Sequence, residues 1–186
     1  MLLLWWYTII EKLKIILFSI LSIISLFYIK ETVDNKNKQN HEKKLIEAFF
    51  SKDGIARTIS TEDKYIGILE IPKIKLKRGF YSINDKRNNI EENITIIKEE
   101  KNLIVLAAHS GNSEIAYFNN IHYLDKDDLI NIYYNNKKIV YKVISKYLDD
   151  KDNKVKIKPN NIKRLILITC NNFDNNNYLI IEAYKL

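Results

Sequence analysis

The stretch KRLILITC, residues 163–170, is an apolar run that ends in the only cysteine of the chain, Cys170. Its Leu and Ile side chains leave no polar face, so the run predicts a central strand that is buried on both sides. A polar loop, NNFDNNN, follows, and YLIIEAYKL, residues 178–186, predicts a further strand. Cys170 is therefore either a nucleophile at a strand end or a small apolar side chain of the core.

Short runs rich in Ile, Val and Tyr fill the chain from Lys64 onward. Residues 64–77, KYIGILEIPKIKLK, alternate like a strand, with Pro72 as a sign of an edge or a bulge. NLIVLAAH, residues 102–109, predicts another central strand, and residues 128–149 predict a hairpin. The turn of this hairpin falls on Asn135, Asn136 and Lys137.

Two short helices are expected between these strands, at residues 89–98 and 117–123. In the second of them, the buried stripe is Phe118, Ile121 and Leu124. Together the elements predict a mainly β fold, a mostly antiparallel barrel or sandwich.

An uncharged apolar run, Ile15 to Ile29, lies between lysines near the N-terminus. As a helix it would be about 22 Å long, short of the roughly 30 Å hydrocarbon core, but the flanking lysines can snorkel and extend it. A cleaved signal peptide is the alternative, yet no cleavage site of small residues follows Ser25. We expect an uncleaved single-pass anchor, with its N-terminus cytoplasmic because Lys12 and Lys14 precede the run.

The chain is expected to have three parts. Residues 1–30 form a cytoplasmic tip and a transmembrane anchor, residues 31–63 a stalk with a helix, and residues 64–186 an extracellular β domain. The stalk begins as a polar, disordered segment and becomes helical before it stops near Gly54. The apolar stripe of that helix is Leu45, Ile46, Phe49 and Phe50.

Composition excludes several function classes. The 30 Lys and Arg against 23 Asp and Glu give a formal net charge of +7, but nearly all of the positive charge is dispersed lysine. The four arginines are Arg57, Arg78, Arg87 and Arg164. Because they are scattered, we expect no nucleic-acid binding.

No metal or cofactor is expected either. A single cysteine excludes an internal disulfide and a cysteine-rich zinc site. The acidic residues Glu114, Asp125, Asp127 and Asp128 are near one another in sequence, but they fit solvated turn carboxylates better than a calcium site. An exported domain with one free thiol is unusual, since its compartment tends to pair or eliminate thiols.

A thiol attacks as the thiolate and needs a proton acceptor or a cation nearby. Among the three histidines, His41 lies in the stalk and His122 on the surface of the second short helix. His109 differs, because it ends an apolar strand and is followed by Ser110 and Gly111. Each of His109 and Cys170 alone could be an ordinary core residue, but two central strands that end in these side chains favour a catalytic pair.

The chain order narrows the choice among cysteine and serine enzymes. The histidine precedes the cysteine, whereas papain-like enzymes have the reverse order, and the caspase signature around the cysteine is absent from ITCNN. No Gly-x-Ser-x-Gly motif supports a serine triad.

The motifs in their order resemble the sortases, membrane-anchored cysteine transpeptidases of Gram-positive bacteria. They are an N-terminal anchor, YIGILEIPKIKLKRGFY, LAAHSGNSEIAYFNNIHYLDKDDLINIYY and LILITCNN, and the resemblance covers residues 64–186. It implies a sortase-like eight-stranded β-barrel. It also implies that Cys170 attacks between Thr and Gly of a Leu-Pro-x-Thr-Gly-like sorting signal to give a thioester, while His109 handles the protons.

The resemblance also implies the partners and a third site residue. The partners are surface proteins with a C-terminal sorting signal, and an amine acceptor on a cell-wall precursor or a pilin. The third residue is an arginine on the strand after the cysteine, but its position falls on Tyr178, which can donate one hydrogen bond and carries no charge. Arg78 and Arg164 are the candidate substitutes.

The missing arginine leaves two hypotheses about activity. The first is a sortase that uses Cys170 and His109, and the second is a catalytically impaired sortase-fold binding module. A third, another exported thiol acyltransferase, agrees less well with the order of the motifs.

Overall fold

The computed structural model describes residues 2–50, 65–111, 113–135, 137–151, 155, 157, 161–171, 174 and 176–186. The chain divides into two compact units, Met1–Lys44 and Leu45–Leu186. The expected boundary at residue 63 and the expected end of the helix near Gly54 lie outside the described residues.

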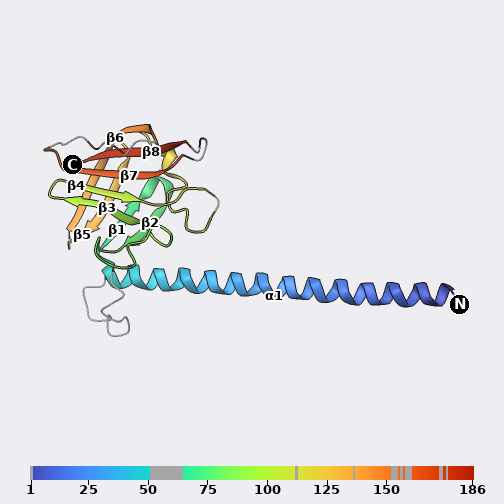
Figure 1. Cartoon of the computed structure of the whole chain (residues 1–186). Helices are drawn as coiled ribbons and strands as arrows, with labels where there is room; N and C mark the ends of the chain where they lie inside the picture. Colours follow the sequence, from blue (N-terminus) through green and yellow to red (C-terminus); the bar gives the residue numbers. More distant parts are fainter. Residues whose placement is uncertain are drawn as a thin grey trace. The chain divides into compact units, whose positions relative to one another are not determined.

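The N-terminal helix α1, Leu2–Phe50, is 49 residues long (Figure 1). No glycine or proline occurs in the first 50 residues, so nothing in the sequence interrupts the helix. The expectation of a disordered start to the stalk is therefore wrong, because residues 31–44 are helical. By length and composition, Glu11–Phe50 contains a segment able to cross a membrane, and a signal sequence would meet the same test.

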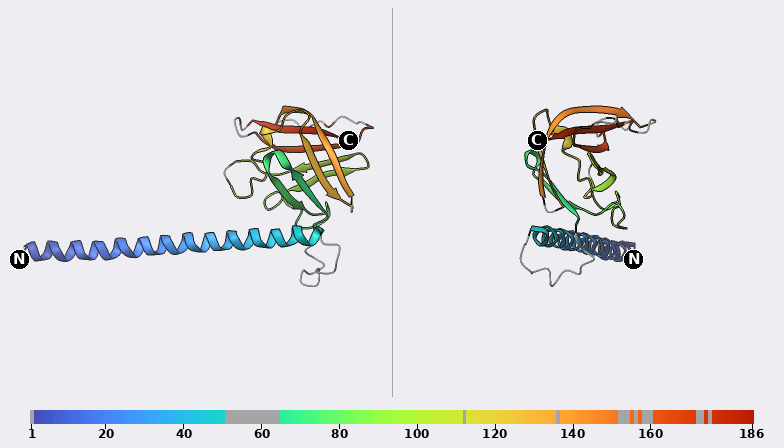
Figure 2. Two further views of the ribbon diagram at one scale, coloured as in Figure 1. Left: turned by 180° about the vertical axis from the view of Figure 1, so that it is seen from behind. Right: turned by 90° about the vertical axis from the view of Figure 1, so that its left-hand side faces the viewer.

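The described part of the second unit contains one eight-stranded sheet. Its strands are β1 Gly67–Ile71, β2 Leu76–Phe80, β3 Thr95–Glu100, β4 Leu103–Ala107, β5 Leu129–Tyr134, β6 Lys137–Asp150, β7 Arg164–Cys170 and β8 Asn177–Lys185. They lie in the order β2-β1-β5-β6-β8-β7-β4-β3. The sheet curls into a half-barrel, as the two views in Figure 2 show, and a bridge between Phe80 and Ile94 links its two edges.

The pairing of β4 with β7 is parallel, whereas the other strand pairs are antiparallel. The expected eight-stranded, mostly antiparallel β fold is thus confirmed. The parallel pair is important for the site, because the C-terminal ends of β4 and β7 lie at the same end of the sheet.

The expected single strand at residues 64–77 is instead a hairpin of β1 and β2. Pro72 opens a 3-10 helix, η3 Pro72–Ile74, and Lys75 follows in the left-handed region with φ 54°. Proline fixes its own φ and has no N–H for the sheet, so the chain turns at this point instead of continuing the strand.

The expected helix at residues 89–98 is wrong, because residues 90–92 form only a turn and β3 begins at Thr95. β-branched residues fill this segment and favour a strand. The Asn88 side chain holds the start of the strand, since its Oδ1 accepts from Ile96 N at 2.8 Å and its Nδ2 donates to Ile96 O at 3.0 Å.

Most of the remaining elements agree with expectation. The runs at residues 102–109 and 163–170 contain the central strands β4 and β7, and the hairpin at 128–149 is β5 and β6. Its turn includes Asn135, with φ 50°, while Asn136 lies outside the described residues. The expected helix at 117–123 is shorter, a 3-10 helix η4, Ile121–Tyr123. Its stripe is fully buried: Phe118, Ile121 and Leu124.

The strands β4, β7 and β8 are covered on both faces. One face joins the main core through Leu106, Leu167 and Ile181. The other face supplies a second apolar cluster, formed by Leu103, Val105, Ala107, Ile166, Ile168 and Ile180. This second cluster is the surface on which the candidate site is built.

Candidate active site

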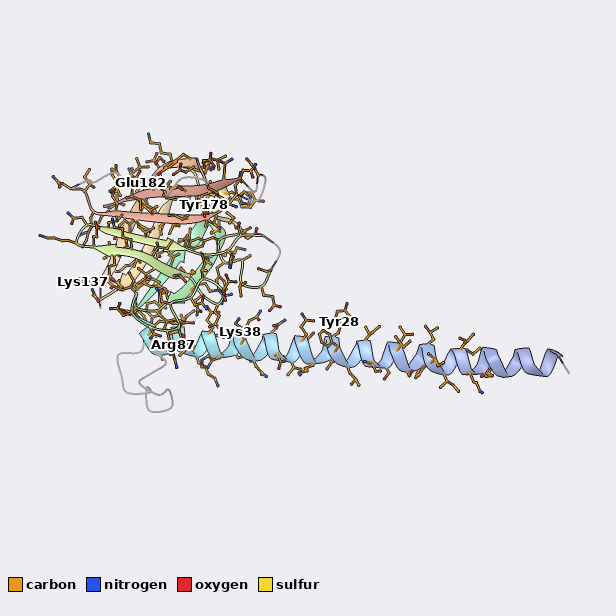
Figure 3. All side chains as sticks on the ribbon, viewed as in Figure 1. Tyr28, Lys38, Arg87, Lys137, Tyr178 and Glu182 are labelled. Atoms are coloured by element: carbon orange, nitrogen blue, oxygen red, sulfur yellow. The ribbon has the colours of Figure 1, made fainter. Side chains whose placement is uncertain are left out.

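Strand alternation places the three predicted site residues on one face. Successive side chains of a strand point to opposite faces, so residues two apart share a face. Cys170 follows Ile168 of the second apolar cluster by two residues, and His109 follows Ala107 in the same way. Tyr178 on β8 precedes Ile180 by two and packs against that cluster. Figure 3 labels Tyr178 at its place on the sheet.

The strand register places these residues next to one another. β4 and β7 pair in parallel with Ala107 opposite Ile168, and Ala108 N then donates to Ile168 O at 3.3 Å. Extended by two residues beyond this last pair, the same register brings His109 level with Cys170. On the other side of β7, Cys170 is directly opposite Tyr178 of β8. Neighbouring strands lie about 4.8 Å apart, so His109, Cys170 and Tyr178 form a row across three adjacent chain segments.

All three residues line one cleft with a volume of about 770 Å³. Its walls are mainly apolar. The lining residues are Ile90, Ile97, Lys98, Val105, Ala107, Ala108, His109, Lys151, Val155, Ile157, Ile168, Thr169, Cys170 and Tyr178. Cys170 is a free thiol that is neither buried nor fully exposed.

Hydrogen bonds continue from the ends of β4 and β7 into the loops that follow. Thr169 Oγ1 donates to Ala108 O at 2.7 Å. Ser110 Oγ donates to Cys170 O at 2.5 Å. These two bonds tie the segment that carries His109 to the strand that carries Cys170, so the two side chains keep their register beyond the last strand pair.

The loop after His109 is fixed by its backbone. Phe118 N donates to His109 O at 2.9 Å, and Gly111 N donates to Asn119 Oδ1 at 3.1 Å. Gly111 has φ 115°, in a region that favours glycine because other residues are strained there.

A carboxylate approaches the imidazole of His109. Its Nε2 lies 3.4 Å from Oε2 of Glu91, which is a well-exposed side chain of the segment before β3. The Nε2 atom itself is buried. The pair brings a negative charge to the histidine on the side of the cleft formed by Ile90 and its neighbours.

Neither arginine that was considered as a substitute lies in the cleft. Arg78 on β2 sits over the ring of Tyr117, with its guanidinium carbon 5.0 Å from the ring centroid. Arg164, at the far end of β7, is buried and donates to Glu182 at 2.8 Å. The cations of the described cleft are lysines, Lys98 and Lys151.

The two other histidines lie outside the cleft lining. His41 is an exposed residue of α1. His122 is half-buried on η4, and its Nδ1 lies 2.8 Å from Asn119 O.

Among the described residues, no group of three or more His, Cys, Asp or Glu could hold a metal ion. Asp125 and Asp128 contact Lys73 instead, and Asp127 contacts Lys142.

Three contributors to the site were not identified from the sequence: Ser110, Glu91 and Lys151. In the sequence, Ser110 indicates only a loop after His109. Glu91 lies in the segment for which the sequence predicts a helix. Lys151 could have been found only by pairing β6 with β8, because its place beside Tyr178 depends on that register.

Comparisons with known proteins agree with this architecture. A family model described as the sortase domain matches residues 69–185. A search of curated protein sequences returned no match. Among solved structures, sortase A from Corynebacterium diphtheriae superposes with a TM-score of 0.58 at 20% identity, covering 66% of this chain and 60% of that chain.

Two sortase C structures are similar to the same degree. The lid mutant of sortase C1 from Streptococcus agalactiae has a TM-score of 0.56 at 20% identity, covering 67% of this chain and 70% of that chain. Sortase C from Streptococcus pneumoniae has a TM-score of 0.57 at 17% identity, covering 74% of this chain and 76% of that chain. The match spans less than two thirds of the sortase A from Corynebacterium diphtheriae. At these identities the likeness shows a shared fold.

Proposed function

The chain belongs to the sortase family, and from that premise we propose that it is a cysteine transpeptidase with Cys170 as nucleophile and His109 as general acid and base. The family implies sorting-signal substrates in general terms. The observation that supports the residue assignment is the parallel register of β4 and β7, which sets the two side chains level at one rim of the cleft.

The proposed reaction has two halves. In the first, the Cys170 thiolate attacks the threonine carbonyl carbon of a Leu-Pro-x-Thr-Gly-like signal, and the S–C bond forms. The C–N bond to glycine then breaks, and the His109 imidazolium gives its proton to the leaving amine. In the second half, His109 takes a proton from the incoming amine, which attacks the thioester and frees Cys170.

We propose that the substrates are surface proteins with a C-terminal sorting signal. The acceptor is an amine of a cell-wall precursor or a pilin. The walls of the cleft support this choice, because they offer apolar contacts along the outer face of β4 and β7 to an extended peptide. The long apolar helix α1 suits an enzyme whose substrates and acceptor are at the membrane.

Tyr178 stands where the family has its arginine, and we propose that its hydroxyl donates a hydrogen bond to the carbonyl oxygen under attack. Its position directly opposite Cys170 supports this role. A phenol provides a donor without a full charge, so the site needs another source of positive potential to match an arginine.

The test uses the full chain in detergent micelles with a panel of Leu/Asn-Pro-x-Thr/Ser-Gly peptides. Mass spectrometry should find a thioester on Cys170 in the wild type and none in Cys170→Ala. His109→Gln should form it at least about 100-fold more slowly, as expected for loss of a general acid. His122→Gln, a histidine outside the cleft, is the matched control and should behave as the wild type.

The same panel tests the alternative of a binding module without turnover. If the wild type forms no adduct with any peptide, and Cys170→Ala binds the peptides as tightly as the wild type does, the enzyme assignment fails. The chain would then be a catalytically impaired sortase-fold binding module.

A further inference from the structure

Lys151, the residue after β6, brings a positive charge to the cleft that holds Cys170. We propose that this ammonium group supplies the cation of the site, held over Tyr178 and directed at the carbonyl oxygen of the substrate. The inference rests on the proposed function, since it assigns a role within the same thioester-forming step. It places the charge on a different strand from the one that carries the family arginine.

Backbone pairing fixes where Lys151 lies. β6 and β8 are antiparallel, with Asp149 opposite Tyr178 and Asp150 opposite Asn177. The ladder continues one step, because Lys151 N donates to Asn176 O at 3.0 Å. The side chain therefore leaves a backbone that is hydrogen-bonded up to that residue.

The Lys151 side chain then reaches toward the site. Its Nζ lies 5.5 Å from the ring centroid of Tyr178, a cation–π distance. Tyr178 is directly opposite Cys170, and all three residues line the same cleft. The order across the sheet is thus a lysine from β6, a tyrosine on β8 and a cysteine on β7.

Two other described cations near the site contact carboxylates. Lys98 lines the cleft, but its ammonium pairs with Glu100 at 2.8 Å. Arg164 is on the cleft face of β7 but is buried against Glu182. Lys151 is the cleft cation that contacts a residue of the proposed catalytic row.

A positive charge beside Cys170 stabilises the transition state for thioester formation more than it stabilises the bound peptide. The carbonyl oxygen becomes an oxyanion as the thiolate adds, so a cation that is already in place lowers the barrier to thioester formation. Lys151 donates hydrogen bonds and positive potential to that oxygen and transfers no proton.

A first experiment needs no peptide substrate and uses the full chain in micelles. Cys170 is the only thiol, so its alkylation can be followed with iodoacetate, an anion, and with iodoacetamide, which is neutral. Lys151→Met should lower the ratio of the iodoacetate rate to the iodoacetamide rate about three- to tenfold. The reason is that a nearby positive charge attracts the anion and not the neutral reagent. Lys151→Arg should keep the wild-type ratio.

Lys137→Met is the matched control for this experiment. Lys137 begins the same strand at its opposite end and is exposed, so the variant loses the same charge far from the cysteine (Figure 3). Its rate ratio should stay within about twofold of the wild type, since exposed charges beyond about 10 Å are screened. An equal fall in both lysine variants would overturn the proposal.

A second experiment measures thioester formation with a peptide that the wild type accepts. Lys151→Met should lower kcat about 10- to 100-fold and change KM much less, as for the loss of one oxyanion donor. Lys151→Arg should recover most of the rate. Adding Tyr178→Arg to Lys151→Met should also recover rate, because it returns a cation beside Cys170.

The outcomes separate this inference from the proposed function. A wild type that forms no thioester with any peptide overturns both. A wild type that forms the thioester, with Lys151→Met as fast and with an unchanged alkylation ratio, overturns the role of Lys151 alone. The thermal midpoint of each variant is measured beside the wild type, and Lys151→Gln, which also removes the charge, carries the test if Lys151→Met is destabilised.

Discussion

At the scale of single residues, the backbone and the side chain of Cys170 have different neighbours. The carbonyl accepts from Ser110 Oγ at 2.5 Å, while the thiol faces the cleft beside His109 and Tyr178. A nucleophile must keep its geometry while its side chain stays accessible, because small misplacements of reacting groups cost rate. We therefore expect Ser110 to be a positioning residue for the proposed pair of His109 and Cys170.

The Ser110→Ala variant should lower kcat for thioester formation about three- to tenfold while KM stays close to the wild type. The reason is that one hydrogen bond, worth about 1 kcal/mol, no longer ties the His109 segment to β7. Steady-state kinetics on the full chain checks this, with Ser113→Ala as a serine control in the same loop. An unchanged kcat would contradict the positioning role.

Asp85 gives the described loop before β3 a pH-dependent contribution to stability. Arg87 donates to its carboxylate from Nε at 2.9 Å, from Nη2 at 2.7 Å and from the backbone N at 2.9 Å. These side-chain and backbone bonds lower the pKa of Asp85 to about 2. Because the pKa is lowered on folding, the stabilisation is full above about pH 4 and is lost as the pH falls toward 2.

The Asp85→Asn variant should therefore be less stable than the wild type by about 1 kcal/mol at pH 6, and this difference should vanish near pH 2. Urea unfolding of the full chain at a series of pH values measures it. Arg87→Met should lose the same pH dependence, since it removes the partner. A difference between Asp85→Asn and wild type that stays constant from pH 6 to pH 2 would contradict the assignment.

At the scale of elements, the parallel pair β4 and β7 determines the site, and its two strands were predicted from their apolar runs alone. The same runs identified His109 and Cys170, because each ends in a reactive side chain. Which strands would be neighbours could not be predicted. Pairing partners depend on contacts between distant segments, and a period of two identifies a strand without naming its neighbour.

The elements that were missed had mixed or misleading local signals. Pro72 was identified as a break but not as the turn of a hairpin, and the β-branched run from Ile94 to Ile97 was assigned to a helix. Lys151 follows the end of β6 and has no motif around it. Its proximity to the cysteine depends on the β6 and β8 register and on the Tyr178 ring, both of which are tertiary features.

Two buried tyrosines on central strands differ in whether their hydroxyl groups have a hydrogen-bond partner. Burial raises the pKa of Tyr141, on β6, to about 12, and its hydroxyl has no hydrogen-bond partner among the described residues. Tyr134, on β5, is also buried, but its hydroxyl donates to Glu99 of β3. An unpaired buried polar group destabilises the fold, whereas a paired one contributes modestly.

Tyr141→Phe should therefore raise the free energy of unfolding by about 1 kcal/mol, while Tyr134→Phe should lower it by about the same amount. The two changes remove the same atom from buried tyrosines, so each is the control for the other. Urea titration of the full chain measures both. Equal destabilisation by the two variants would show that the Tyr141 hydroxyl has a partner.

At the scale of the whole molecule, α1 exposes a continuous apolar surface between Leu13 and Ile29. A soluble domain rarely presents so much apolar surface to water, and a lipid bilayer would cover it. Lysines at both ends of the run would lie in the headgroup layers. We expect a single span with the N-terminus cytoplasmic and the domain from Leu45 onward outside the cell.

The lone cysteine reports this orientation directly. A membrane-impermeant maleimide added to intact cells should label Cys170, because the thiol lines an open cleft and the expected orientation puts that cleft outside the cell. Cys170→Ala should remain unlabelled. Adding Thr8→Cys to that variant should give labelling only after the cells are permeabilised, since positive residues near the N-terminus hold that end in the cytoplasm. Labelling of Cys170 only in lysed cells would place the domain inside and separate it from sorting signals on exported proteins.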